Sequence, residues 1–285
     1  MTPGPAARRA PLTPARRWVL AVGVVLSVAA IAWGALQLAN VLGRTTEERS
    51  ATLPATGGRL VVSSSGGSVR VTAADVDDIR VVSKLRYGLS APELRQDSGP
   101  DGVHLAASCP WYSSWCSVDY EITIPIGMAV SAESSGGSVT VRGGSGAVDV
   151  SSSGGSVTVA DTTGSVRAHS SGGSVTVRAV TGTVDLDSSG GGILGTGLRG
   201  GDAHAESSGG NVRLVFDVPP DLVQASSSGG EVEVLLPRVD GGYRVDASSS
   251  GGDQVVEVPT DPASARQVTV HSSGGDARVL QTEAG

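Results

Sequence analysis

Two cysteines and the aromatic residues between them are the side chains of this sequence best suited to chemistry. Cys109 and Cys116 are the only cysteines, and they bracket Trp111, Tyr112 and Trp115. In an oxidising compartment, two cysteines this close in sequence and with no others in the chain form a disulfide. The disulfide closes a small loop and contributes roughly 2–3 kcal/mol to stability. A metal site would need more ligands than this segment supplies. We therefore predict a disulfide that closes a loop with three large aromatic side chains.

The serines and histidines do not form a hydrolytic pattern. The serines are concentrated in predicted turns, and no Gly-x-Ser-x-Gly elbow occurs. The four histidines are scattered, and His169 and His204 fall on outward strand positions beside Asp or Glu in the repeat described below. A Ser-His-Asp site needs a convergent pocket, which a thin rod lacks. We predict no catalytic residues, no metal site, no cofactor and no enzymatic activity.

The elements that position these residues follow from the tripeptide Ser-Ser-Gly, which occurs nine times. Between successive tripeptides, the pattern Gly-x-Val-x-Val recurs every nine residues. Apolar β-branched residues two apart predict short strands with one buried face, whereas a helix needs spacings of three and four. A glycine-punctuated period near 20 residues predicts an all-β fold, a single β-solenoid of about nine coils of 18–23 residues. The tripeptides end at Gly66, Gly136, Gly154, Gly172, Gly190, Gly209, Gly229, Gly251 and Gly274.

Each predicted coil has two strands and two corners. One corner reads Ser-Ser-Gly-Gly in nearly every coil, and we call it the serine corner. The opposite corner, here called the variable corner, differs between coils (143–145, 161–163 and 179–181) and takes the later insertions, as at 217–220 and 259–262. The paired glycines of the serine corner are expected to supply a positive φ, where a Cβ would clash.

Stacked coils place equivalent side chains roughly 4.8 Å apart, so outward residues should form ladders. Asp149, Arg167 and Asp185 then alternate in charge, and each such neighbour pair adds about 0.2–1 kcal/mol. Polysaccharide lyases with β-helices cluster such groups in a groove, whereas here the charges pair with each other. These ladders therefore indicate structural reinforcement. Two further rows are Ser138, Ser156, Ser174 and Thr140, Thr158, Thr176.

An uncharged stretch of 19 residues from Trp18 to Leu36 predicts a transmembrane helix over 18–40. The basic tail 1–17 is then cytoplasmic by the positive-inside rule, and the remaining chain is extracytoplasmic at the plasma membrane. A cleaved signal peptide is the alternative, although the apolar stretch exceeds the usual core of about 7–15 residues.

Residues 41–57 are expected to form a linker, followed by the solenoid over 58–285. Between 72 and 127 the period fails, and this insertion carries the two cysteines and most aromatics of the ectodomain. It is expected to cover the membrane-proximal end of the rod, where open strand edges invite pairing. Alternatively, it presents Trp111, Tyr112 and Trp115 as a candidate binding loop, because exposed Trp and Tyr dominate contact energies.

Charge and composition restrict the partners. Residues 1–43 hold four arginines and no acid, so the remaining chain has 17 basic against 28 acidic residues. Such an acidic rod has no electrostatic reason to bind nucleic acid or anionic lipid. Aromatics make up only 3% of the chain, which suits the narrow aliphatic core of a β-helix.

The repeated Ser-Ser-Gly-Gly-x-Val-x-Val units behind an N-terminal anchor resemble the bacterial "putative adhesin" β-solenoids of the DUF4097 or toastrack type. The stretches 84–90 and 109–120 resemble its actinobacterial members. The resemblance covers roughly 50–285 and implies a surface-exposed, non-enzymatic solenoid, with no catalytic residues to carry over. Some relatives are linked to cell-envelope stress signalling.

We therefore expect a non-enzymatic cell-surface module, an adhesin or structural binding module, whose partners are cell-wall glycan or other surface or membrane proteins. The alternative is an accessory of envelope-stress signalling that acts through membrane-protein partners. The number of coils and the patterned acidic faces favour the first function. The short linker favours the second, because it keeps the rod near the bilayer.

Overall fold

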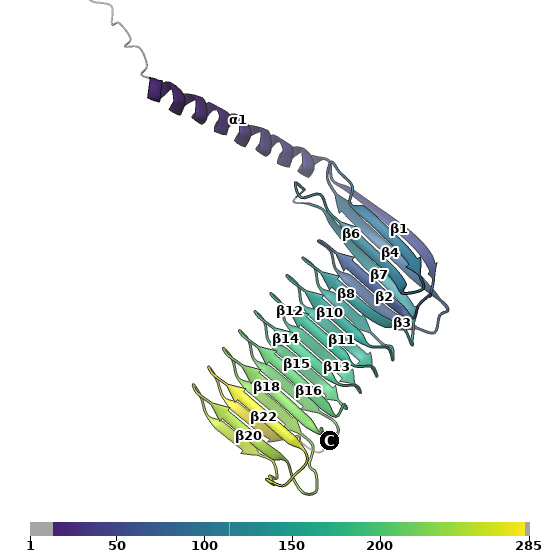
Figure 1. Cartoon of the computed structure of the whole chain (residues 1–285), viewed down its shortest axis with the longest axis vertical. Coiled ribbons are helices and arrows are strands. Elements are labelled where there is room, and N and C mark those ends of the chain that lie inside the picture. Colours follow the sequence, from purple (N-terminus) through teal and green to yellow (C-terminus); the bar gives the residue numbers. More distant parts are fainter. Residues whose placement is uncertain (1–13, 114, 283–285) are drawn as a thin grey trace, which may run out of the picture.

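The structure is a computed structural model that describes residues 14–113 and 115–282. One helix, α1 (Pro14–Leu42), precedes a rod of stacked strands (Figure 1). The predicted transmembrane segment 18–40 lies within α1, and the helix begins inside the residues expected as a tail. The rest of that tail, 1–13, lies outside the described residues.

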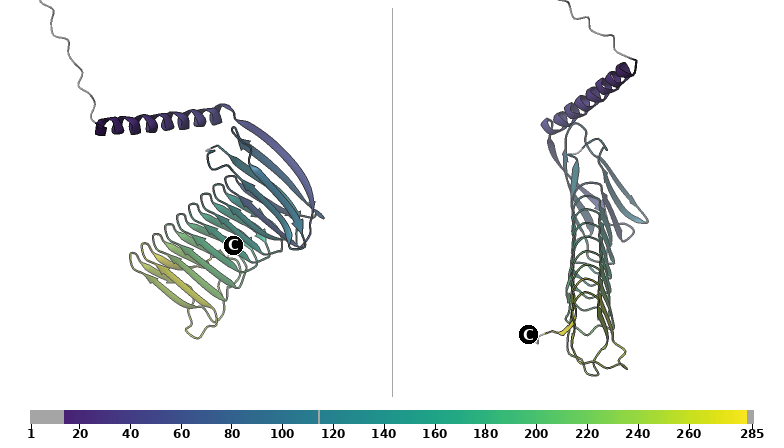
Figure 2. Two further views of the ribbon diagram at one scale, coloured as in Figure 1. Left: turned by 45° about the horizontal axis from the view of Figure 1, so that its top comes forward. Right: turned by 90° about the vertical axis from the view of Figure 1, so that its left-hand side faces the viewer.

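Two sheets face each other along the rod, which Figure 2 shows edge-on as two walls. The first sheet has 12 strands, in the order β1 (Thr45–Pro54), β4 (Asp78–Tyr87), β7 (Ser117–Pro125), β3 (Val69–Ala74), β9 (Val139–Arg142), β11 (Val157–Thr162), β13 (Val175–Val180), β15 (Ile193–Leu198), β17 (Val212–Phe216), β19 (Val232–Leu236), β23 (Ala277–Gln281) and β21 (Gln254–Glu257). The second has 11, in the order β20 (Arg244–Ser249), β22 (Gln267–Ser272), β18 (Leu222–Ser227), β16 (Asp202–Ser207), β14 (Val184–Ser188), β12 (Val166–Ser170), β10 (Val148–Ser152), β8 (Ala129–Ser134), β2 (Arg59–Ser64), β6 (Gly102–Ser108) and β5 (Glu93–Gly99).

The core lies between the two sheets and consists mainly of aliphatic side chains. The predicted alternation is confirmed, because Val157 and Val159 on β11 are fully buried while Thr158 between them is only half-buried. Larger side chains fill the rod toward its two ends, with Tyr120 at one end and Phe216 and Tyr243 toward the other. Neighbouring strands of the solenoid run parallel and in register, for example Val157 beside Val175.

The predicted β-solenoid is confirmed, and it contains one coil beyond the nine that carry Ser-Ser-Gly. That coil is formed by β6 and β7 inside the segment expected as an insertion. The order of coils also departs from the chain order at both ends. The β2–β3 coil lies between β6–β7 and β8–β9, and the β22–β23 coil lies between β18–β19 and β20–β21.

Two boundaries expected from the sequence are wrong. Most of the expected linker 41–57 is the ten-residue strand β1, which pairs antiparallel with β4. An edge strand needs a partner, and β1 covers the edge that β4 would otherwise expose. The expected insertion 72–127 is also not wholly outside the repeat: β4 and β5 are additions, antiparallel to β7 and β6, while β6 and β7 continue the solenoid.

Close stacking, rather than a positive φ, requires glycine at the serine corners, so the expectation from the sequence is wrong. No serine-corner glycine of the described chain has a positive φ. A Cβ on Gly155 would lie 2.5 Å from the carbonyl carbon of Gly137 in the neighbouring coil. Positive φ occurs instead at variable corners, at Gly143, Gly144, Asp161, Ala179 and Gly197.

The first serine of each serine corner holds neighbouring coils together. Ser170 Oγ donates a hydrogen bond to the carbonyl oxygen of Gly155 in the adjacent coil (2.9 Å) and accepts one from Gly173 N in its own corner (2.9 Å). Its hydroxyl thereby satisfies backbone groups that the tight turn leaves without strand partners. The same pair of bonds is made by Ser64, Ser134, Ser152, Ser188, Ser207, Ser227, Ser249 and Ser272.

Candidate functional site

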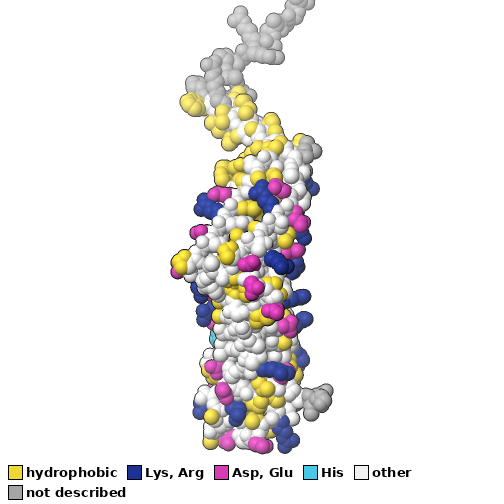
Figure 3. All heavy atoms as spheres, turned by 90° about the vertical axis from the view of Figure 1, so that its right-hand side faces the viewer, with side chains coloured by type: hydrophobic (Ala, Val, Ile, Leu, Met, Phe, Trp, Pro, Cys, Tyr) yellow, Lys and Arg dark blue, Asp and Glu magenta, His cyan; other side chains and the backbone are white. Residues whose placement is uncertain are grey.

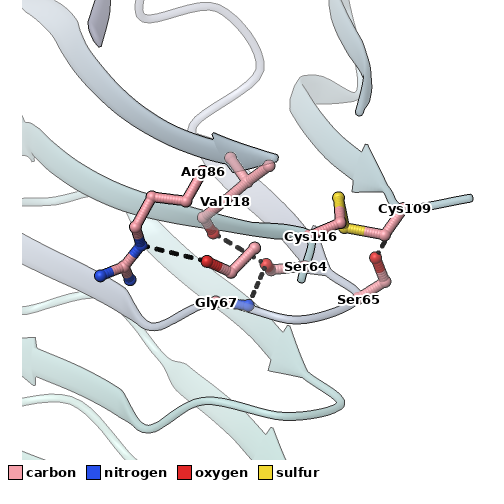
Figure 4. Close-up of a disulfide and its surroundings, with 8 residues drawn as sticks. Ser64, Ser65, Gly67, Arg86, Cys109, Cys116 and Val118 are labelled. Atoms are coloured by element: carbon pink, nitrogen blue, oxygen red, sulfur yellow. Dashed lines mark hydrogen bonds between the residues drawn. A yellow bond between two sulfur atoms is a disulfide. The ribbon is translucent and has the colours of Figure 1, made fainter. Parts of the chain in front are cut away.

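The disulfide loop, residues 109–116, occupies the place of a serine corner. Cys109 and Cys116 are bonded as predicted, with their Cα atoms 5.7 Å apart, and the loop joins β6 to β7 as serine corners join the sheets elsewhere. Ser64 Oγ donates to the carbonyl oxygen of Val118 (3.1 Å), where a glycine carbonyl accepts in the regular coils. Ser65 Oγ accepts a hydrogen bond from Cys109 N (2.9 Å) (Figure 4). The outermost coil is therefore closed by a covalent bond instead of the repeat motif.

The loop directs its two tryptophans outward. Trp111 is 87% exposed and Trp115 is 50% exposed. Tyr112 lies edge-on to Trp111, with ring centroids 5.7 Å apart, and its hydroxyl hydrogen-bonds to Ser90 Oγ (2.9 Å). The three aromatic residues are therefore brought together on one disulfide-closed loop, with the two indoles accessible. Their role in binding stays a prediction.

The same loop lies against the C-terminal end of α1. Gln37 Nε2 donates to the carbonyl oxygen of Tyr112 (3.5 Å), and the guanidinium carbon of Arg44 lies 4.0 Å from the ring centroid of Trp115. Leu89, from the loop after β4, is 56% exposed and approaches Gly43. Only Gly43 and Arg44 separate α1 from β1. Sequence reasoning missed this junction, because its partners are distant in the chain.

The outer faces of the two sheets carry opposite charge along the regular coils. Between β8 and β18 the second sheet presents mainly acids, whereas the first sheet presents mainly arginines. Figure 3 shows both signs along one side of the rod, with hydrophobic side chains gathered at its α1 end. On the second sheet the acids are Glu133, Asp149, Asp185, Asp187, Asp202 and Glu206, with Arg167 among them, and on the first sheet the arginines are Arg142, Arg178 and Arg213, with Asp161 among them.

The predicted ladders are confirmed in register. Asp149 lies beside Arg167, which lies beside Asp185, and Arg167 Nε is 3.0 Å from Asp185 Oδ2. The hydrogen bond that Arg167 donates to Asp185 raises the pKa of the Arg167 guanidinium. Thr158 lies between Thr140 and Thr176 in the same way. Exposed pairs of this kind contribute little to stability, and their charges are already partnered.

A mixed cluster lies on the second sheet, where His169 and His204 were expected to form part of a charged column. The ligand atoms of Asp187, His204 and Glu206 lie within 4.8 Å of one another, and His169 neighbours Asp187 in the strand register. Imidazole and carboxylate suit a divalent cation such as Zn²⁺. Burial, followed by the charge of Asp185, raises the pKa of Asp187. The absence of a metal site stays a prediction.

A hollow on the first sheet near the disulfide end contains paired charges. Lys84 Nζ lies 3.0 Å from Glu121 Oε1, and Arg86 forms an ion pair with Asp119. The hydrogen bond to Glu121 raises the pKa of Lys84, which keeps this amine protonated. A protonated, partnered lysine is a poor nucleophile or base. These groups therefore fit a role in holding β4 against β7.

Comparisons with known proteins concern the solenoid. The family model described as Toastrack DUF4097 matches residues 57–282. Similar solved structures include a "putative adhesin" from Bacteroides fragilis (13% identity, TM-score 0.49, covering 84% of this chain and 97% of that one). A second is a "putative adhesin" from Parabacteroides distasonis (10% identity, TM-score 0.39, covering 84% of this chain and 97% of that one). A third is a "putative cell adhesion protein" from Clostridium sporogenes (10% identity, TM-score 0.29, covering 84% of this chain and 100% of that one). No curated protein matches the chain.

Proposed function

Because this chain belongs to the Toastrack DUF4097 family, we propose that it is a non-enzymatic binding module at the cell surface, an adhesin anchored by α1. One observation carries this proposal. The charged side chains of the regular coils stand on two flat outer faces, and they pair with each other where an ion pair was described above, as Arg167 does with Asp185. The space between the sheets is filled by aliphatic side chains. Flat, periodic faces suit contact with an extended partner, such as wall glycan or a surface protein, better than they suit catalysis.

The exposed apolar surface of α1 supports the anchor. Residues 22–39 have a mean hydropathy of 2.0, and large side chains such as Trp18 and Ile31 are exposed in the described part of the chain. A helix that is apolar on all sides needs an apolar environment, and this one is long enough to span a bilayer. The solenoid would then be extracytoplasmic, which agrees with its disulfide.

A second candidate function is an accessory of envelope-stress signalling, and the length of the junction favours it. With β1 starting at Thr45, only two residues connect the helix to the folded rod. This connection would keep the solenoid at the bilayer surface, within reach of other membrane proteins.

In-cell crosslinking of the tagged full-length protein, followed by mass spectrometry, distinguishes the two candidates. The adhesin predicts recovery of wall material or foreign surface proteins. Recovery of a membrane kinase or transporter would instead favour the signalling accessory. Labelling of whole cells with a membrane-impermeant reagent tests the topology separately, since the solenoid should be modified and the N-terminal segment protected.

A further inference from the structure

We propose that the disulfide loop and Leu89 form a second membrane contact, which inserts into the extracytoplasmic lipid interface beside α1. This inference rests on the proposed membrane anchor. It assigns the loop a lipid ligand, in place of the glycan or protein expected for a binding loop.

The side chains on this surface are those that favour the boundary between lipid and water. Trp111, Trp115 and Leu89 are exposed large apolar residues at the same end of the rod. Tryptophan is enriched at membrane interfaces, because its ring is apolar and its N–H still reaches water. In a purely aqueous setting, two accessible indoles on one loop would be an unfavourable exposure of apolar surface.

The contacts with α1 place the loop at the right depth. Gln37, which donates to the carbonyl oxygen of Tyr112, lies two residues before the end of the apolar window at Ala39. At 1.5 Å per residue, this contact is about 3 Å inside the end of the span. Interfacial elements lie about 5–10 Å deep at the headgroup boundary, so the loop need not move to reach it.

The charge of the loop differs from that of the rod. Residues 105–118 and 87–92 contain no charged side chain, although the chain after residue 43 carries an excess of acids. The nearby cation, Arg44, lies over the ring of Trp115, where it can face lipid phosphates while its stem lies along apolar groups. These two segments therefore carry no acid of their own, although Glu47 accepts a hydrogen bond from the hydroxyl of Tyr87, and they can approach a bilayer without losing hydrated charge from their own side chains.

The described residues of the loop are also held by several contacts before binding. The disulfide closes it, Ser65 Oγ accepts from Cys109 N, and Ser90 holds the hydroxyl of Tyr112. A preorganised loop loses little conformational entropy on insertion, so most of the gain from burying two indoles is retained.

Tryptophan fluorescence of the full-length protein tests the proposal directly, because the chain has only Trp18, Trp33, Trp111 and Trp115. The protein is reconstituted in phosphatidylcholine vesicles with brominated acyl chains. The variant W18F/W33F reports on the loop, and the matched variant W111F/W115F reports on α1. We expect quenching in both variants, with the loop variant quenched most strongly by bromines near the headgroups and its emission blue-shifted relative to an exposed indole.

The two variants separate failure of this inference from failure of the anchor. If W111F/W115F is quenched while W18F/W33F is unquenched and emits like an indole in water, α1 spans the bilayer and the loop proposal is overturned. If neither is quenched, the anchor itself fails, and the loop proposal fails with it.

A photocrosslinking residue at position 111 provides a second, in-cell readout. The side chain at this position is exposed, so we expect the variant to fold, and thermal unfolding of the purified variant checks this. Adducts with phospholipid are expected. Adducts confined to a protein or to wall glycan would overturn the proposal and identify the loop as a partner-binding loop.

Discussion

The serine corner and the variable corner join the same two sheets, yet they meet different physical demands. At the serine corner, successive coils approach so closely that a Cβ on the second glycine would overlap the neighbouring backbone. At the variable corner, the chain adopts left-handed conformations, even at Asp161 and Ala179. Glycines at both corners meet the neighbouring backbone, for example Gly155 in a serine corner and Gly164 in the turn at a variable corner. Only the variable corner also contains left-handed residues, and it can vary in length.

The disulfide loop shows what happens where the serine corner has no further coil to meet. It stands at the end of the stack, so the demand for close approach applies only on the side facing Gly66. A longer corner with large side chains fits there, and a covalent bond closes it.

Replacing the second glycine of a serine corner should have the largest effect on stability. In G155A the new methyl group meets backbone atoms that cannot move without displacing the next coil, and we expect a loss of about 3 kcal/mol or more. G143A at a variable corner incurs the left-handed penalty and a contact of 3.3 Å with the carbonyl oxygen of Ala73, which is far looser than the overlap in G155A, so it should cost about 1–2 kcal/mol. Thermal unfolding followed by circular dichroism compares them, and equal losses would contradict the distinction.

Removing the disulfide should destabilise the outermost coil by roughly 2–3 kcal/mol. The double variant C109S/C116S leaves the regular coils with their serine bridges, so the effect should stay local. Hydrogen exchange should speed up in β6 and β7 while β12 and β13 keep their protection. Faster exchange throughout the rod would show that this end holds the whole stack together.

Removing a serine bridge should cost about 2 kcal/mol, because S170A leaves the buried carbonyl of Gly155 and the amide of Gly173 without their partner. The neighbouring serine is exposed, so S171A is the matched control and should change the unfolding temperature little. A similar effect of both variants would refute the bridging role.

Removing the hydroxyl of Tyr120, at the disulfide end, should change stability in the opposite direction. Its buried hydroxyl has no hydrogen-bond partner among the described residues, unlike the bridging serines, so Y120F should be neutral or stabilising by up to about 1 kcal/mol. Burial raises the pKa of Tyr120 to about 12 from 10.0, so this group costs no stability below pH 10, and its ionisation in the unfolded chain lowers stability as the pH rises from 10 toward 12. Unfolding measured at pH 8 and pH 11 should show that Y120F lacks this alkaline loss.

The outward charge ladder should matter least. R167Q removes an exposed ion pair, and we expect a small loss of stability that shrinks at high salt. Unfolding in low and high sodium chloride measures it. A loss as large as that of S170A would mean that the outer faces stabilise the stack as much as the corners do.

Local repetition is what made the regular coils predictable. The spacing of Val157 and Val159 specifies a buried strand face, and repeating it specifies the stack. The strand β1 escaped prediction because its pairing with β4 depends on an edge created elsewhere in the chain. The need for glycine was recognised but its cause was not, since a close approach and a positive φ select the same residue.

The candidate site was predictable in composition but not in position. The spacing of Cys109 and Cys116 was sufficient for the disulfide. Its place as the corner of a further coil was not visible, because that coil lacks Ser-Ser-Gly. The contact between Gln37 and Tyr112 joins residues 75 apart in the chain, and no local pattern indicates it.

The inverted order of the last two coils has a consequence for synthesis. As the chain emerges from its N-terminus, coils from β8–β9 to β18–β19 can each dock on the one before. The β20–β21 coil cannot, because its place is next to β22–β23, which is synthesised last. A chain that ends before residue 267 would therefore lack the β22–β23 coil and would also leave the β20–β21 coil without its neighbour, so the strands β22 and β23 complete the assembly of two coils.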